Sequence, residues 1–233
     1  MVKLRNEVAG LFLYNGAPSV APARSGGLPG DDSMSQQEPR KASVSRETLE
    51  TQIAVELCLD GTGQCTLDTG LPFLEHMLDQ TTRYSSIDLD LDAKGDLEID
   101  AHHTVEDLGW CIGEAVNNAL LNKAGINRFA SLSLPMDETL SSCSLDVSGR
   151  PWLEWRVILP NEKIGDVDAE IFQEFFRAFA QSAKMTIHIE NNYGNNAHHI
   201  IESCFKVLAV CLKNSLSIMP KNKDVIPSTK GVI

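Results

Sequence analysis

The pattern His-His-x-x-Glu occurs twice in this chain, at residues 102–106 and again at residues 198–202. Each copy lies at the start of a helix-like apolar pattern, and each of these patterns follows a strand-like stretch. A chain that repeats both the order of its elements and its polar residues consists of two related units. The repeat therefore predicts a duplicated fold.

The expected elements follow the same order in both halves. In the first half, strands are expected at residues 50–61, 63–70 and 86–93, and helices at 72–85 and 103–123. In the second half, strands are expected within residues 130–159 and at 184–190, and helices at 169–183 and 198–216. This order predicts an α+β fold with a duplicated β-β-α-β-α unit, two sheets with helices packed on one face.

The beginning of the chain has a different composition. Residues 16–41 are rich in Gly, Pro, Ser and Ala and lack an apolar period, which predicts a disordered arm over residues 1–42. A targeting segment is the alternative: Arg24 and the small residues fit a transit peptide, whereas Glu7 and Asp31 do not. The first repeat then spans residues 43–124 and the second spans residues 125–233.

The composition narrows the classes of partner and compartment. A formal net charge of −12 disfavours nonspecific binding to nucleic acid or to an anionic membrane. The longest apolar stretches are too short to cross a bilayer. The six cysteines form no CxxC pair, which is typical of thiols in a reducing compartment. We therefore expect a cytoplasmic protein, or a plastid protein if the first residues are a transit peptide.

The acidic run "DLDLD" at residues 88–92 resembles a calcium loop or a phosphatase motif. Leu89 and Leu91 alternate with the acids, however, as on a half-buried strand, and Gly95 is misplaced for a calcium loop. We interpret this run as a solvated strand face.

The two histidine pairs predict a metal site. His102 is four residues from Glu106 and His103 is three residues from it, and both spacings place side chains on one side of a helix. Imidazole and carboxylate are common ligands of Mn, Fe, Co and Zn. Adjacent helical residues point about 100° apart, so the two histidines of a pair do not share one ion while the helix is regular. Each pair therefore implies two ions.

The number of candidate ligands fits two ions. Six histidines and the two matching glutamates give each ion three imidazoles and one carboxylate, with positions left for water or substrate. A lone histidine is more often a surface or core residue, so the support for His76 and His188 is weaker than for the pairs. The predicted ligands are His76, His102, His103, Glu106, His188, His198, His199 and Glu202.

Several longer strings occur together and in order: "LDTGLPFLEHMLDQ", "GDLEIDAHHTVEDLG", "SLDVSGRP", "NAHHIIESCFK" and "IPSTKG". From about Ser43 to the C-terminus the chain closely resembles the imidazoleglycerol-phosphate dehydratase family of histidine biosynthesis. The resemblance implies a hydro-lyase with two Mn²⁺ ions per active site. It also implies a homo-oligomer of 24 subunits, with sites built between neighbouring chains and a small phosphate substrate.

The resemblance also implies roles for individual residues. All eight predicted ligands would bind metal, and Glu50 would contact the substrate. The residues that match the family's phosphate contacts are Arg128, Arg150, Ser228 and Lys230, and Lys206 stands where the family has a lysine close to the substrate. Glu75 and Ala101 replace aspartates that are common in the family, but neither is a ligand position. Some members of the family carry a fused phosphatase domain, which would require its own aspartate nucleophile motif and a longer chain. This sequence has neither, so a monofunctional enzyme is expected.

The implied reaction removes water from the glycerol-phosphate chain that the substrate's imidazole carries. The reaction is difficult because the proton must leave a carbon atom that has no adjacent carbonyl group to accept the negative charge. A ring bound to metal through its nitrogens loses its own proton more easily and can expel the hydroxyl, after which a carboxylate removes the C–H proton. Glu50 is the candidate acid/base ahead of Glu202, and Lys206 completes the catalytic set. Without the resemblance, Glu50 would be interpreted as a solvated strand residue.

Two other functions fit the ligand count alone. A dinuclear metallohydrolase would use the ions to activate water, although such sites usually contain a bridging carboxylate. A noncatalytic assembly would use the metals to stiffen subunit contacts, which gives no reason for the Arg and Lys residues.

Overall fold

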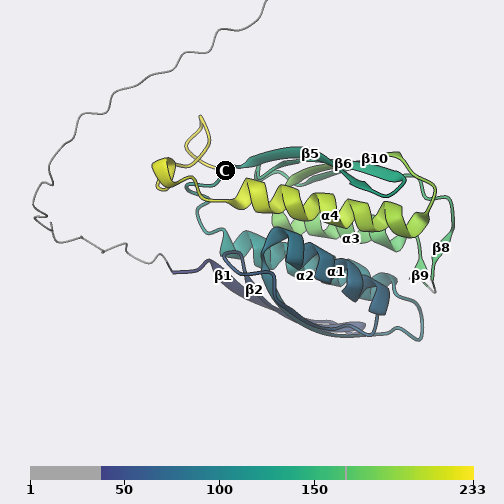
Figure 1. Ribbon diagram of the computed structural model, residues 1–233. Coiled ribbons are helices and arrows are strands. Elements are labelled where there is room, and N and C mark those ends of the chain that lie inside the picture. The colour runs from purple at the N-terminus through teal and green to yellow at the C-terminus, as the bar shows by residue number, and fades with distance from the viewer. Residues whose placement is uncertain (1–37, 166) are drawn as a thin grey trace, which may run out of the picture. The chain divides into compact units, whose positions relative to one another are not determined.

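The computed structural model describes residues 38–165 and 167–233. Residues 1–37 of the expected N-terminal arm lie outside this part of the chain. In the described part, two four-stranded sheets enclose a layer of four helices (Figure 1). The first strand begins at Lys41, two residues before the expected start of the first repeat.

The two halves contain the same sequence of main elements. The first half consists of β1 (Lys41–Glu47), β2 (Thr51–Cys58), β3 (Cys65–Asp68), α1 (Pro72–Ser85), β4 (Asp88–Gly95) and α2 (His102–Ala119). The second half consists of β5 (Phe129–Met136), β6 (Thr139–Asp146), β7 (Trp152–Arg156), α3 (Ile171–Ala183), β10 (Thr186–Tyr193) and α4 (Ala197–Leu216). A small hairpin of β8 (Lys163–Ile164) and β9 (Val167–Asp168) precedes α3, and a 3-10 turn (Pro220–Asn222) follows α4.

The strand orders show the duplication directly. The sheets have the orders β1-β2-β4-β3 and β5-β6-β10-β7. In the first, β4 is antiparallel to β2 and parallel to β3, and in the second, β10 is antiparallel to β6 and parallel to β7. The expected α+β fold with a duplicated unit is therefore confirmed.

Each unit contains one strand more than the β-β-α-β-α pattern. In the first half this strand is β1, "KASVSRE", which lies at the sheet edge and directs only Ala42 and Val44 toward the core. Two small apolar residues give only a weak alternation of apolar and polar positions. They also directly follow the Gly/Pro-rich stretch, so the sequence pattern did not identify this strand. Pairing with β2 over its whole length makes it a strand.

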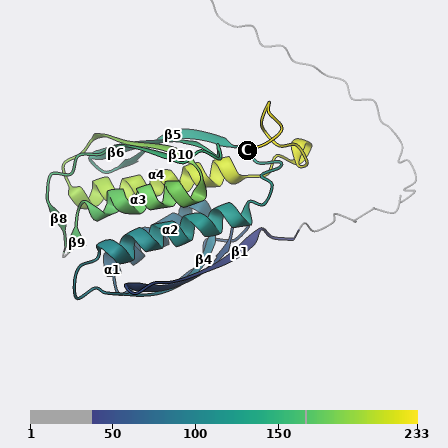
Figure 2. The same ribbon diagram turned by 180° about the vertical axis from the view of Figure 1, so that it is seen from behind.

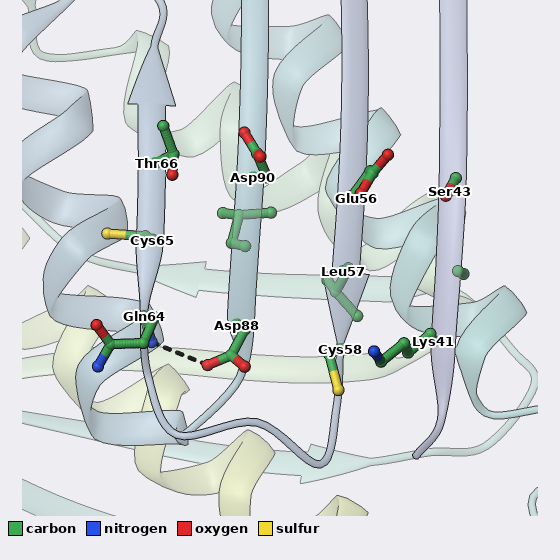
Figure 3. A pocket seen from close by; sticks show the side chains of 12 residues that line it. Lys41, Ser43, Glu56, Leu57, Cys58, Gln64, Cys65, Thr66, Asp88 and Asp90 are labelled. Carbon is green, nitrogen blue, oxygen red and sulfur yellow. Dashed lines mark hydrogen bonds between the residues drawn. The ribbon is translucent and has the colours of Figure 1, made fainter. Parts of the chain in front are cut away.

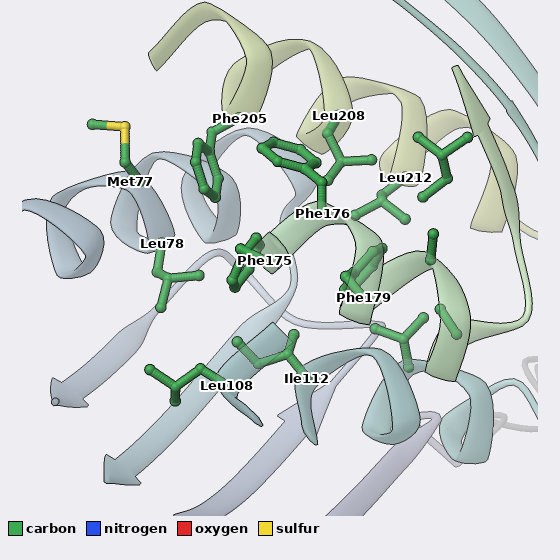
Figure 4. Close-up of a cluster of buried hydrophobic side chains, with 14 of the residues drawn as sticks. Met77, Leu78, Leu108, Ile112, Phe175, Phe176, Phe179, Phe205, Leu208 and Leu212 are labelled. Atoms are coloured by element: carbon green, nitrogen blue, oxygen red, sulfur yellow. The ribbon is translucent and has the colours of Figure 1, made fainter. Parts of the chain in front are cut away.

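The core lies between the sheets, where the helices pack in pairs. Helix α1 contacts α4, and α2 contacts α3. Helices α2 and α3 lie side by side in the view from behind (Figure 2). Phenylalanines of α3 fill the centre of the layer (Figure 4). The ring of Phe205 from α4 lies 4.7 Å from that of Phe176 and 5.2 Å from that of Phe175, centroid to centroid. Such aromatic contacts bury a large apolar area.

Two glycines allow the close approach of α2 to α3. A Cβ at Gly109 would lie 2.5 Å from the carbonyl oxygen of Phe175, and one at Gly113 would lie 2.6 Å from that of Phe179. Both neighbours are helix backbone, so they cannot move aside as a side chain can. The spacing of four residues places both glycines on the same side of α2.

No helix in residues 38–165 or 167–233 is long and apolar enough to cross a membrane. All six cysteines are free thiols, and Cys111, Cys143, Cys204 and Cys211 are buried.

Gly113→Ala should lower the thermal midpoint of unfolding. Crowding the α2–α3 contact costs about 1–3 kcal/mol, more than the gain of about 1 kcal/mol in helix propensity. The matched control is Asn118→Ala, at an exposed position of the same helix, which should keep or raise the midpoint. The midpoints are measured by differential scanning fluorimetry. An equal rise in the midpoints of both variants would contradict the role of Gly113 in the close approach of α2 to α3.

Candidate metal centre

Three of the predicted ligands meet between α1 and α4. Within the described residues, ligand atoms of His76, His198 and Glu202 lie within 4.8 Å of one another. Oε2 of Glu202 is 3.0 Å from Nε2 of His198 and 3.5 Å from Nε2 of His76. Two imidazoles and a carboxylate facing one point fit a divalent transition metal.

Glu202 is the buried member of this cluster. Its side chain is only 7% exposed, and Nζ of Lys206, one helical turn away, lies 2.6 Å from Oε1. Burial alone would raise the pKa of Glu202, but the hydrogen bond and charge of Lys206, together with His198 and His76, bring it below its usual value. The carboxylate is therefore ionised, as a metal ligand must be.

Both histidine pairs lie in the first turn of a helix whose end is fixed by a side chain. The Asn196 side chain accepts hydrogen bonds from the backbone N–H groups of His198 and His199, and that of Asp100 accepts one from the N–H of His102. These contacts satisfy donors that a helix start leaves free.

Within each pair the two rings diverge. Their centroids are 6.1 Å apart in both pairs, and their planes are inclined by 87° in the first and by 83° in the second. The rings of one pair therefore point toward different places.

His103 of the first pair lines a cavity at the start of α2, together with Glu50 and Glu106. Nε2 of His102 lies 3.8 Å from Oε2 of Glu106, and Nδ1 of His103 lies 3.8 Å from Oε2 of Glu50. Glu50 does not lie on a strand, because the chain turns there between β1 and β2. The cavity has a volume of about 430 Å³, and Trp110 also lines it.

The structure separates His188 from the other predicted ligands. It lies on β10 between the buried Ile187 and Ile189, so its side chain points away from the helices, over the outer face of the second sheet. There it borders a depression with Phe129 and Asp146. One chain therefore does not bring all eight ligands together.

Two carboxylates that the sequence did not single out contact the second histidine of each pair. Oδ2 of Asp96 lies 3.0 Å from Nδ1 of His103, and Oε2 of Glu138 lies 2.7 Å from Nδ1 of His199. The hydrogen bond to Asp96 raises the pKa of His103, and the one to Glu138 raises that of His199. The His199 contact in turn lowers the pKa of Glu138 to about 2. Asp96 stands seven residues before His103, but no spacing signals a partner 61 residues away.

The residues expected to hold a phosphate lie around a third unpredicted carboxylate, Asp146. Nε of Arg128 lies 2.7 Å from Oδ1 of Asp146, and Nη2 of Arg150 lies 3.8 Å from Oδ2. Arg128 also donates to the carbonyl oxygen of Pro227, which brings the C-terminal loop with Ser228 and Lys230 to this region. Arg150 is largely exposed and is free to turn toward an anion.

The acidic run at residues 88–92 lies elsewhere, on the outer face of the first sheet (Figure 3). Asp90 and Asp92 are exposed, in keeping with a solvated strand face. Asp88 has a different role: its Oδ1 accepts three backbone N–H bonds from residues 62–64, which fixes the turn between β2 and β3 and lowers its pKa.

Comparison with known proteins agrees with the fold and identifies the family. The family model described as imidazoleglycerol-phosphate dehydratase matches residues 69–212. The crystal structure of imidazoleglycerol-phosphate dehydratase from Staphylococcus aureus subsp. aureus N315 superposes with a TM-score of 0.70 at 35% identity, covering 77% of this chain and 99% of that one. The enzyme (IGPD) from Pyrococcus furiosus, in complex with (S)-C348, gives a TM-score of 0.70 at 31% identity, covering 82% and 100%.

Lys206→Met should destabilise the metal-free protein by about 3 kcal/mol, because it leaves the buried Glu202 carboxylate without its closest cation. This corresponds to a fall of roughly 6–12 °C in the thermal midpoint at neutral pH. Lys213→Met, at an exposed lysine of the same helix, is the control and should have little effect.

The destabilisation should also depend on pH. The wild-type Glu202 has a lowered pKa, so its contribution to stability is present above the unfolded-state pKa and is lost as pH falls through the folded value. In the variant, burial dominates and raises the pKa, so acid relieves the penalty. The difference between the two midpoints should therefore begin to shrink above about pH 4.5, the ordinary value of a glutamate, and should shrink further as pH falls below it. A difference that is constant with pH would contradict the ion-pair role.

Proposed function

The chain belongs to the imidazoleglycerol-phosphate dehydratase family, metal-dependent hydro-lyases of histidine biosynthesis, and we propose that it uses a two-Mn²⁺ site that binds the substrate's imidazole. In this reaction imidazole-glycerol phosphate loses water to give imidazole-acetol phosphate. The observation that carries the proposal is the cluster of His76, His198 and Glu202, two imidazoles and a carboxylate that converge inside the residues that the family model matches.

The ligand chemistry supports two ions. The diverging rings of each pair face different places, so His102 with Glu106 and His198 with Glu202 each offer one ion an imidazole and a carboxylate. Metal bound there would supply Lewis acidity that makes the substrate ring a better electron acceptor. Mn²⁺ is our proposal for the ion by family resemblance, because the donor set also suits Fe, Co and Zn.

The chain's own residues would bind the substrate and move its protons. Glu50 stands at the hairpin turn beside His103, largely exposed, where it can reach a substrate proton and exchange it with water. Lys206 holds the Glu202 carboxylate ionised. Arg128, Arg150, Ser228 and Lys230 would bind the phosphate, since guanidinium and ammonium groups suit a dianion.

We further propose that the active sites form between neighbouring chains of a homo-oligomer, with 24 subunits by family resemblance. The support is the position of His188, whose side chain is on the opposite side of a sheet from the helix layer. A site that uses His188 together with the ligands at the helix ends requires a second chain. We expect this assembly in the cytoplasm, or in a plastid if residues 1–42 are a transit peptide.

The purified, Mn²⁺-loaded protein should dehydrate imidazole-glycerol phosphate and should not hydrolyse esters. Lys230→Ala should raise KM for this substrate and keep its Mn²⁺ content, whereas His198→Ala should lose both Mn²⁺ and activity. Lys221→Ala, at another exposed lysine near the C-terminus, is the control. Absence of turnover by the loaded wild type, followed by product analysis, would refute the proposed substrate.

Subunit complementation tests whether sites lie between chains. His188→Ala and His198→Ala should each be inactive, but co-assembly of equal amounts should restore roughly a quarter of wild-type activity, because some sites then take both intact residues from different chains. The variants are mixed after metal removal, and Mn²⁺ is then restored. If both ligands of a site came from one chain, the mixture would stay inactive.

A further inference from the structure

The second histidine of each pair makes the same kind of contact in both halves. Nδ1 of His103 meets a carboxylate at 3.0 Å, and Nδ1 of His199 meets one at 2.7 Å. In neither case does the carboxylate come from the helix that carries the histidine. Asp96 follows directly after β4, and Glu138 lies in the turn between β5 and β6.

The duplication does not explain this repetition. After β10, the strand equivalent to β4, the chain continues into Gly194, and no aspartate follows directly. The β1–β2 turn, equivalent to the turn that holds Glu138, carries Glu50, but this residue stays 3.8 Å from His103. Two elements that are not equivalent in the duplication therefore place a carboxylate at Nδ1 of the second histidine. This repetition indicates that the histidine itself needs a carboxylate at that atom.

The chemistry of imidazole identifies that requirement. A neutral imidazole has one N–H and one lone pair, and a carboxylate accepts a hydrogen bond but cannot donate one when ionised. A carboxylate at Nδ1 therefore holds the proton on Nδ1 and leaves the lone pair on Nε2. Carboxylates placed in this way behind metal-bound histidines fix the ring orientation and strengthen binding.

Glu138 is held in place by the backbone, whereas the only side-chain hydrogen bond of Asp96 within the described residues is the one to His103. Oε1 of Glu138 accepts hydrogen bonds from the backbone N–H groups of Asn195 and Asn196, at 3.2 and 2.9 Å, which leaves Oε2 for His199. Asp96 is 14% exposed, and its Oδ1 is buried without a hydrogen-bond partner, so its polar contact with His103 is through Oδ2. A buried oxygen left unpaired is costly.

We propose that Asp96 and Glu138 are positioning residues that hold His103 and His199 with the proton on Nδ1 and present Nε2 to the metal. This role rests on the proposed function, because it requires that both histidines bind Mn²⁺. It adds two carboxylates that act through the ligands and touch neither substrate nor metal.

Amide substitutions distinguish the two carboxylates sharply. In Asp96→Asn, the side-chain oxygen can take the place of Oδ2 and still accept from Nδ1–H of His103. In Glu138→Gln, the amide oxygen must remain on the N–H groups of Asn195 and Asn196, so the NH₂ group faces His199. An NH₂ donor at Nδ1 moves the ring proton to Nε2, which then cannot bind metal.

The experiment is calorimetric titration of the chelator-treated protein with Mn²⁺. Glu138→Gln and Asp96→Ala should each lower the affinity of the affected site by about 10–100-fold, the usual cost of losing such a partner. Asp96→Asn should restore most of the affinity lost in Asp96→Ala. The controls are Glu98→Ala and Asp137→Asn, exposed carboxylates two residues and one residue away, which should match wild type.

The possible results separate the positioning role from the proposed function. Wild-type protein that binds no Mn²⁺ would overturn both. Normal binding by the wild type and equal affinity in Glu138→Gln would overturn the positioning role alone, and so would a loss in Asp96→Asn as large as in Asp96→Ala. The two amide variants nearly preserve side-chain shape, and equal thermal midpoints without metal would exclude a folding defect as the cause.

Discussion

The buried carboxylate of Glu202 is the interaction on which the rest of the site depends. An ionised glutamate that is 7% exposed requires a cation, and Lys206 supplies it from the next helical turn. The same carboxylate lies beside His198 of α4 and His76 of α1, so it joins the ligands of the two helices. Because the neighbouring contacts lower the pKa of Glu202, the metal-free protein already holds a ligand in its charged form, and binding need not first remove a proton.

The packing of the helix layer provides the rigidity that such a site needs. Gly109 and Gly113 bring the backbone of α2 against α3, and the phenylalanines join α3 to α4. Ligands on packed helices are held more precisely than ligands on loops. Glu50 and Lys230, the proposed acid/base and phosphate contact, lie outside this layer, in a turn and in the C-terminal loop.

The sequence predicted what depends on local period and spacing. The helices, the pairing of His102 with Glu106, and the divergence of adjacent rings follow from 3.6 residues per turn. It did not predict the strand β1, whose pattern has too few apolar residues, or the position of Glu50 in a turn. Asp96, Glu138 and Asp146 were missed because their contacts form only after the chain folds. Glu138 reaches His199 across 61 residues, and no short pattern encodes such a contact.

The exposure of the ligands explains why one chain would leave its site incomplete. His76, His102 and His198 each keep more than 40% of their side chain exposed. An exposed neutral imidazole costs little before assembly, whereas a complete buried cluster of histidines and glutamates in one chain would carry a large desolvation penalty without metal. In the proposed assembly, the position of His188 on the outer face of a sheet would divide this cost among chains. Metal binding and the proposed assembly would then stabilise each other, because an ion that joins ligands from two chains binds only to the assembled state.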